Sequence, residues 1–121
     1  MADHNKLVII VTHGPQDPEL ATLPFVVGVA ALASDVETVM AFQADGVCLM
    51  HEGEASTVQA PELAPLASLI SDFQELGGSL LVCLPCIKGR GITDTLIPGT
   101  EVIAAARLVA EVTSATSTLV Y

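Results

Sequence analysis

A run of apolar and β-branched residues near the start of the chain, KLVIIVT at 6–12, most constrains the fold. Such an uninterrupted run is typical of a strand that is buried on both faces of a parallel sheet. Similar runs follow at 37–42 (ETVMAF) and 79–83 (SLLVC), and STLVY at 117–121 ends the sequence. Stretches with helical character separate these runs. Strands that alternate with helices predict an α/β fold with a mainly parallel sheet.

Three longer helices are predicted between the strands. The first covers about 18–33, because Asp17 and Pro18 form an N-cap followed by proline. A second opens at Pro61 and Glu62 and is stopped by Gly77–Gly78. The third is predicted to begin at Thr100 and Glu101. Shorter helical segments are expected at 47–50 and 84–91.

Composition places the 121 residues in one domain, 1–121, and indicates self-association. The chain is 51% hydrophobic and only 15% charged, where about 25% charged is usual. This apolar surplus exceeds what one small core can hide, so we expect a homo-oligomer.

Charge and segment length exclude several partners. Four Lys and Arg residues against 14 Asp and Glu residues give a net charge of −10, which disfavours binding to nucleic acid. The charge-free stretch Leu20–Ser34 contains Thr22, Pro24 and Gly28, and it is shorter than the roughly 20 apolar residues that cross a bilayer. We therefore expect no membrane partner. The first residues lack the pattern of an export signal, which predicts a cytoplasmic protein.

Cysteine chemistry is the strongest candidate activity. Cys83 ends a predicted buried strand, and the backbone N–H groups that follow could lower its thiol pKa. Two of the four basic residues, Lys88 and Arg90, come shortly after it. Cys83 and Cys86 form a CxxC pair, a spacing that suits thiol–disulfide exchange. The alternative is that both pack as ordinary small apolar side chains.

Other candidates lie after the first two strands. In parallel α/β sheets, reactive groups collect at the carboxyl ends of the strands, where His13 and Asp45–Gly46 are expected. His13 could serve as a proton partner, although a histidine in a turn is often simply solvated. Cys48 lies on an apolar stretch and is predicted to be a core residue. A zinc site would need four ligands, and one CxxC pair supplies two, so we expect no metal and no cofactor.

The sequence resembles the DsrE/DsrF-like family of small sulfur-relay proteins. The likeness rests on VIIVTHGP after the first strand, AFQADGV around Asp45–Gly46, and LLVCLPCIKGRGI around Cys83. It implies a three-layer α/β sandwich with a mainly parallel sheet of about five strands, helices on both faces, and assembly as a homotrimer or homohexamer.

The resemblance also implies a function. Cys83 matches the strand-end cysteine that accepts sulfane sulfur as a persulfide from a donor protein and passes it to an acceptor protein. Cys86 is not a requirement of the relay subunits, and it leaves open whether the chemistry is persulfide carriage or reversible disulfide formation. A non-catalytic assembly or small-ligand-binding module remains a further alternative.

Overall fold

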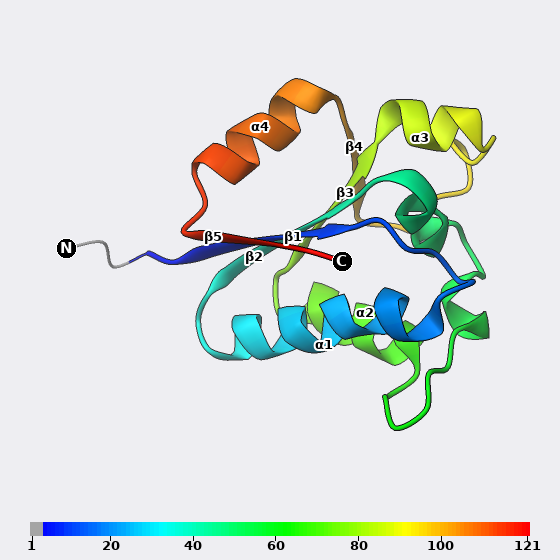
Figure 1. Cartoon of the computed structure of the whole chain (residues 1–121), viewed down its shortest axis with the longest axis horizontal. Helices are drawn as coiled ribbons and strands as arrows, with labels where there is room; N and C mark the ends of the chain where they lie inside the picture. The colour runs from blue at the N-terminus through cyan, green and yellow to red at the C-terminus, as the bar shows by residue number, and fades with distance from the viewer. Residues whose placement is uncertain (1–3) are drawn as a thin grey trace.

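Parallel strands form the centre of the computed structural model, which describes residues 4–121 (Figure 1). Within these residues the sheet has five strands in the order β4-β3-β2-β1-β5, and every neighbouring pair is parallel. The strands are β1 (Lys6–Val11), β2 (Glu37–Phe42), β3 (Ser79–Cys83), β4 (Thr100–Ile103) and β5 (Ser117–Val120). The predicted mainly parallel sheet of about five strands is confirmed.

Helices cover both faces of the sheet and complete the predicted three-layer sandwich. Helices α1 (Pro18–Ala33) and α2 (Leu66–Glu75) lie on one face, and α4 (Ala105–Thr113) lies on the other (Figure 1). The short helix α3 (Leu84–Gly89) and the 3-10 segments η1 (Ala44–Met50) and η2 (Ala55–Thr57) gather near the carboxyl ends of the strands. None of the helices in residues 4–121 is long and apolar enough to cross a membrane.

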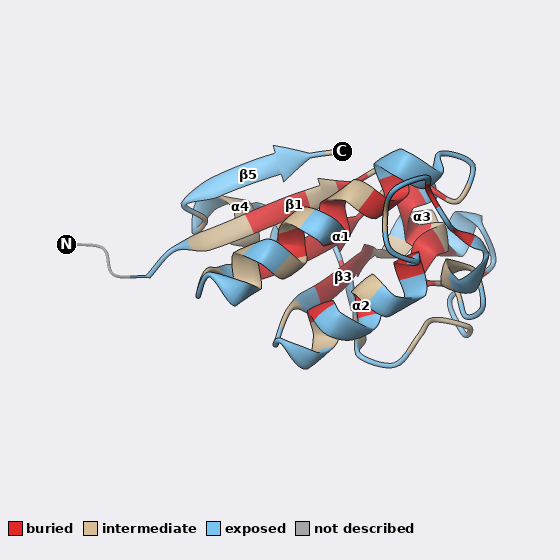
Figure 2. Cartoon of the chain, turned by 90° about the horizontal axis from the view of Figure 1, so that it is seen from below, coloured by how far each residue is buried: buried red, intermediate tan, exposed pale blue. Residues whose placement is uncertain are grey.

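The larger core lies between the sheet and helices α1 and α2. Phe25 of α1 stacks on Phe42 of β2 with ring centroids 5.9 Å apart, and it meets the edge of Phe73 of α2 at 5.6 Å. All three rings are buried. The core under α4 is smaller and has five buried members, Val8, Val39, Ala41, Leu81 and Ile103. Figure 2, viewed from the side of α1 and α2, shows buried residues along β1 and β3 and an exposed β5.

The predicted third helix was wrong at its start. Residues 100–103 form β4, which pairs with β3 through Val82 and Val102, and the helix begins only at Ala105. Thr100 and Glu101 resemble a helix start, but Thr100, Val102 and Ile103 are β-branched and suit a strand. Pairing with the exposed edge of β3 decides the conformation.

The second helix also begins later than predicted, at Leu66 instead of about 61. Glu62 has a positive φ of 64°, which no helix residue adopts. Pro65 is the N-cap, and the residue before a proline is biased away from the helical region.

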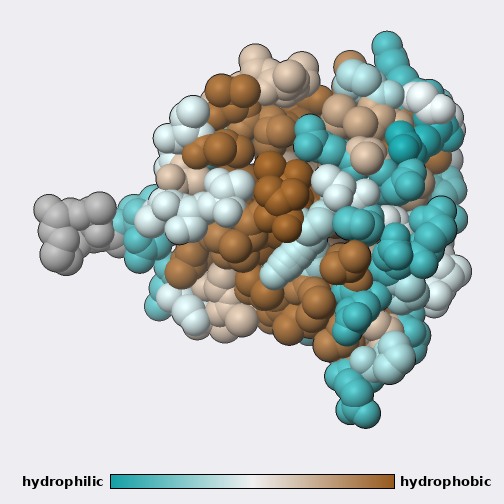
Figure 3. Space-filling view, in the orientation of Figure 1, coloured by the Kyte–Doolittle hydropathy of each residue, from teal (hydrophilic) through white to brown (hydrophobic). Residues whose placement is uncertain are grey.

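Exposed large apolar side chains lie on both edge strands of the sheet and on α4. These side chains are 38–67% exposed and belong to β4, α4 and β5, namely Val102, Val109, Leu119 and Val120. Figure 3 shows hydrophobic atoms gathered over α4 and the strands beside it.

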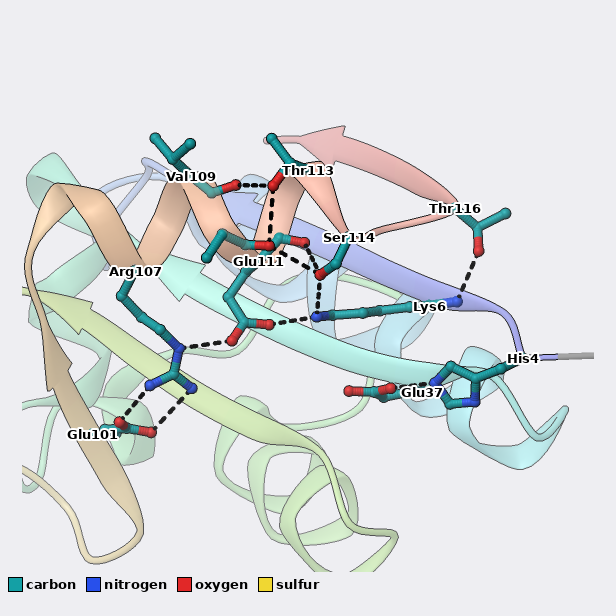
Figure 4. Close-up of polar contacts among 11 residues, drawn as sticks. His4, Lys6, Glu37, Glu101, Arg107, Val109, Glu111, Thr113, Ser114 and Thr116 are labelled. Atoms are coloured by element: carbon teal, nitrogen blue, oxygen red, sulfur yellow. Dashed lines mark hydrogen bonds and ion pairs between the residues drawn. The ribbon is translucent and has the colours of Figure 1, made fainter. Parts of the chain in front are cut away.

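A series of ion pairs connects helix α4 to strands β1 and β4 (Figure 4). Glu111 contacts Lys6 of β1 at 2.7 Å and Arg107 at 2.7 Å, and Arg107 in turn contacts Glu101 of β4 at 2.7 Å. The side chains of Lys6 and Glu111 are each only 13% exposed. Hydrogen bonds from Lys6 and then Arg107 hold the pKa of the Glu111 carboxyl below its usual value.

Replacing Glu111 by glutamine is therefore expected to lower the free energy of unfolding by about 1–2 kcal/mol at pH 7. Because folding depresses the pKa of Glu111, the wild type exceeds the variant in free energy of unfolding by the full amount above the ordinary carboxyl pKa. This difference disappears as the pH falls through the pKa of Glu111 in the folded protein. Urea titrations of both proteins between pH 7 and pH 3 measure this difference. Glu75→Gln, at an exposed position at the end of α2, is the charge-matched control. A constant gap across this pH range would contradict the assignment.

Candidate functional site

The carboxyl ends of three adjacent strands bring the predicted site segments to one edge of the sheet. His13 follows β1, Asp45 and Gly46 lie in η1 after β2, and Cys83 ends β3 (Figure 1). Because β3, β2 and β1 are neighbours and parallel, these segments emerge side by side. The prediction that they share an edge is confirmed.

Cys83 and Cys86 form a close thiol pair. Cys83 is the N-cap of α3 and Cys86 lies in its first turn, so their sulfur atoms are 3.1 Å apart, with the Cys86 thiol donating to the Cys83 Sγ. The Cys86 Sγ also accepts the backbone N–H of Ala44 at 3.4 Å. Both cysteines are free thiols and half-buried. The pair is therefore suited to reactions that join or exchange sulfur atoms.

The expected lowering of the Cys83 pKa was wrong. Burial raises the pKa of the Cys83 thiol, the neighbouring Cys86 thiol raises it further, and only the backbone N–H of Cys86 opposes these effects. Helix α3 has six residues, and Pro85 in its first turn has no N–H to offer. The local donors are too few to offset burial.

Of the two predicted basic residues, Arg90 supports the site. Its guanidinium donates to Asp45 Oδ1 at 2.8 Å and to the carbonyl oxygen of Cys86 at 3.2 Å. Hydrogen bonding to Asp45 raises the pKa of Arg90, so it remains charged. Lys88 is exposed, and within residues 4–121 its side chain makes no hydrogen bond or ion pair. Arg90 thus links η1 to the helix that carries Cys86.

Gly46 lets η1 approach β1. A Cβ at this position would lie 2.1 Å from the carbonyl oxygen of Val11, so no larger residue fits without moving the backbone. The neighbouring Asp45 is then held where Arg90 can reach it. His13 lies on the same edge, but its ring contacts the Thr12 hydroxyl at 3.4 Å and neither thiol. Arg90 therefore links Asp45 to Cys86, whereas His13 and Lys88 make no hydrogen bond to either thiol within residues 4–121.

A small apolar pocket opens beside Cys83. It has a volume of about 80 Å³ and is bounded by the ends of β2 and β3, by Pro85, and by the β4–α4 segment. Ligand sites for drug-sized molecules are about 300–1,000 Å³, so this pocket admits only a small group. Its wall includes Ile103, Ala104 and Leu108, which the sequence interpretation did not select. Only the β-branched character of residues 100–103 indicated that this segment could reach the sheet.

A second hollow of about 400 Å³ is lined by Arg90 together with Cys48, His51 and Glu54. Cys48 was predicted to be a core residue, but it is half-buried and lines this hollow. Burial raises the pKa of its thiol, and the charge of Arg90 opposes that change. His51 contacts the Thr95 hydroxyl at 2.6 Å. In residues 4–121, no three His, Cys, Asp or Glu side chains are placed to hold a metal ion together.

Comparison with known proteins identifies the family. The sequence pattern of the DsrE/DsrF-like family matches residues 5–121. The chain belongs to the DsrE/DsrF-like family. This family is associated with sulfur relay, which agrees with a cysteine at the site.

Two solved structures agree with this chain in fold, and one further protein is similar in sequence. The YchN protein of Escherichia coli superposes with a TM-score of 0.82 at 22% identity, covering 97% of this chain and 99% of that one. The protein MTH1491 of Methanobacterium thermoautotrophicum, of unknown function, gives a TM-score of 0.70 at 16% identity, covering 98% and 100%. An uncharacterised Methanocaldococcus jannaschii protein, MJ0760, is 29% identical over 102 residues. That match covers 84% of this chain and 37% of the relative's length.

Proposed function

We propose that this protein is a sulfur carrier that holds sulfane sulfur as a persulfide on Cys83 and passes it to a partner. The observation that carries the proposal is the half-buried Cys83 thiol beside an apolar pocket of about 80 Å³. A pocket of this size accommodates an added sulfur atom but not a large cofactor. The association of the family with sulfur relay supports the same assignment.

The transfer needs two displacement steps. The Cys83 thiolate attacks the sulfane sulfur of a donor, a new S–S bond forms, and the donor's leaving group departs with the electron pair of the broken bond. An acceptor thiolate then attacks the outer sulfur, and Cys83 leaves as a thiolate. Because the pKa of Cys83 is raised, most Cys83 side chains in the free protein are thiols and not thiolates. The first step therefore includes docking of the donor and removal of the thiol proton.

The proposed partners are a sulfur donor, a sulfur acceptor and further copies of this chain. Exposed apolar side chains on both edge strands and on α4, namely Val102, Val109, Leu119 and Val120, support assembly as a homotrimer or homohexamer. Light scattering that returned the mass of a single chain would contradict this assembly. Three free thiols fit a reducing compartment, and we place the protein in the cytoplasm.

Sulfur loading tests the proposal. Cys86→Ser protein is treated anaerobically with inorganic polysulfide. Its intact mass is expected to rise by about 32 Da, the mass of the one sulfur atom held as a persulfide. The additional Cys83→Ser substitution should abolish that gain, whereas an additional Cys48→Ser substitution should leave it unchanged. An equal gain without Cys83 would place the sulfur elsewhere and refute the carrier role of this residue.

A thiol–disulfide oxidoreductase is the second candidate, favoured by the 3.1 Å contact between the Cys83 and Cys86 sulfur atoms. Such an enzyme would cycle a Cys83–Cys86 disulfide with small dithiols and needs no sulfane donor. The non-catalytic assembly module predicts neither a persulfide nor a disulfide. Loading of the Cys86→Ser protein separates the carrier from both alternatives.

A further inference from the structure

We infer that Cys86 resolves a persulfide formed on Cys83, so that the protein also releases the bound sulfur as sulfide and ends as a Cys83–Cys86 disulfide. This activity rests on the proposed function, because it needs the Cys83 persulfide as its substrate. It differs from sulfur transfer, since no acceptor protein takes the sulfur. Cys86 then decides whether the carried sulfur is kept or released.

The distance between the thiols supports this step. The Cys86 Sγ is 3.1 Å from the Cys83 Sγ, which becomes the inner sulfur of the persulfide. Helix α3 is anchored in this position, because Ile87 is fully buried and Arg90, at the end of the helix, donates to Asp45 of η1. Little movement is needed to bring the attacking sulfur to the reacting one.

The surroundings of the two sulfur atoms favour attack on the inner sulfur. The apolar pocket is bounded by Cys83 and Pro85 but not by Cys86, so an outer sulfur placed there points away from the second thiol. The Cys86 Sγ instead lies against η1, where it accepts the N–H of Ala44. Displacement at sulfur requires the attacking and the leaving sulfur to lie on different sides of the sulfur that is attacked. Cys86 and an outer sulfur in the pocket lie on different sides of the Cys83 sulfur, so this requirement is met.

The step balances without another reactant. The Cys86 sulfur forms a bond to the Cys83 sulfur, the bond between inner and outer sulfur breaks, and the outer sulfur leaves as hydrosulfide with the bonding electron pair. The Cys86 thiol proton is released or carried by the hydrosulfide. Two cysteine sulfurs are oxidised to a disulfide while the sulfane sulfur is reduced to sulfide. A further cycle requires a dithiol reductant to reopen the disulfide.

The test compares wild-type and Cys86→Ser protein under anaerobic conditions. Each is mixed with inorganic polysulfide, quenched with acid and analysed by intact mass, and the released sulfide is assayed in a parallel sample. Wild type is expected to lose about 2 Da as the disulfide forms and to release about one more sulfide per chain than the variant. The variant should instead retain the gain of about 32 Da. Wild type without polysulfide controls for adventitious oxidation, and Cys86→Ala confirms that the serine hydroxyl plays no part.

The other outcomes overturn the inference in distinguishable ways. If wild type keeps the added sulfur on Cys83 as long as Cys86→Ser does, the resolving role is wrong while the carrier function stands. If peptide mapping finds the added sulfur on Cys86 of wild type, attack occurs on the outer sulfur and no sulfide is released. If neither variant nor wild type gains or loses mass, the carrier function itself fails. Circular dichroism verifies that both variants are folded.

Discussion

Replacement of Gly46 by alanine is expected to lower the free energy of unfolding by about 3 kcal/mol, the upper range for overpacking. The new Cβ would lie 2.1 Å from the Val11 carbonyl oxygen and 2.8 Å from its carbonyl carbon, and both are backbone atoms of a central strand. Neither can move by a side-chain rotation. The η1 segment must shift instead, and with it Ala44, whose N–H contacts Cys86.

Gly89→Ala is the matched control for this change. Nothing lies within 4 Å of a Cβ at Gly89, which ends helix α3. Alanine restricts the unfolded chain, so this variant should be neutral or more stable by up to about 1 kcal/mol. Urea denaturation of the three proteins measures both effects. Equal midpoints for Gly46→Ala and Gly89→Ala would show that η1 is not fitted against β1 in the way described.

The second large effect is the pH dependence of Cys83 alkylation. Because burial raises the pKa of this thiol, its thiolate fraction at pH 7 is below that of an ordinary cysteine. The rate of iodoacetamide modification is therefore expected to rise at least about 100-fold between pH 7 and pH 10, against roughly 30-fold for an unperturbed thiol of pKa about 8.5. Peptide-level mass spectrometry follows Cys83 separately from Cys48 and Cys86.

An unstructured peptide spanning residues 79–91 provides the reference, since it contains the same cysteines without the fold. A rate that levels off below pH 8 would mean that the α3 donors outweigh burial. A rate near zero at every pH would mean that the thiol is closed to small molecules, and the pocket beside it would not be an entrance.

Local sequence signals were sufficient for most of the sheet and for one complete helix. The runs at 6–12, 37–42 and 79–83 are apolar because both faces of these central strands are covered, so a single sequence shows them directly. Helix α1 matches its predicted range of 18–33, because Pro18 marks its start. The shared edge of His13, Asp45 and Cys83 followed from parallel topology alone.

The remaining differences arise from tertiary contacts. Residues 100–103 are short and partly polar, and they become β4 only because β3 offers an unpaired edge. With that strand missing from the prediction, the pocket wall of Ile103, Ala104 and Leu108 could not be foreseen. The pKa of Cys83 was then predicted in the wrong direction, because the burial around it depends on the chain folding back over β3.

The CxxC spacing, by contrast, predicted the thiol contact correctly. A cysteine at the N-cap and another in the first turn of a helix lie on neighbouring positions whatever the rest of the fold does. What the spacing could not give was the surroundings of each sulfur. The apolar pocket beside Cys83 and the Ala44 N–H at Cys86 give the two thiols different surroundings, and the proposed roles rest on this difference.

The most direct measurement locates the added sulfur within the chain. Cys86→Ser protein is treated with less than one equivalent of inorganic polysulfide, alkylated to trap persulfides, digested and sequenced by mass spectrometry. The account predicts an alkylated persulfide on the peptide that contains Cys83 and ordinary alkylation at Cys48. A persulfide found mainly on Cys48, or on neither cysteine, would contradict it.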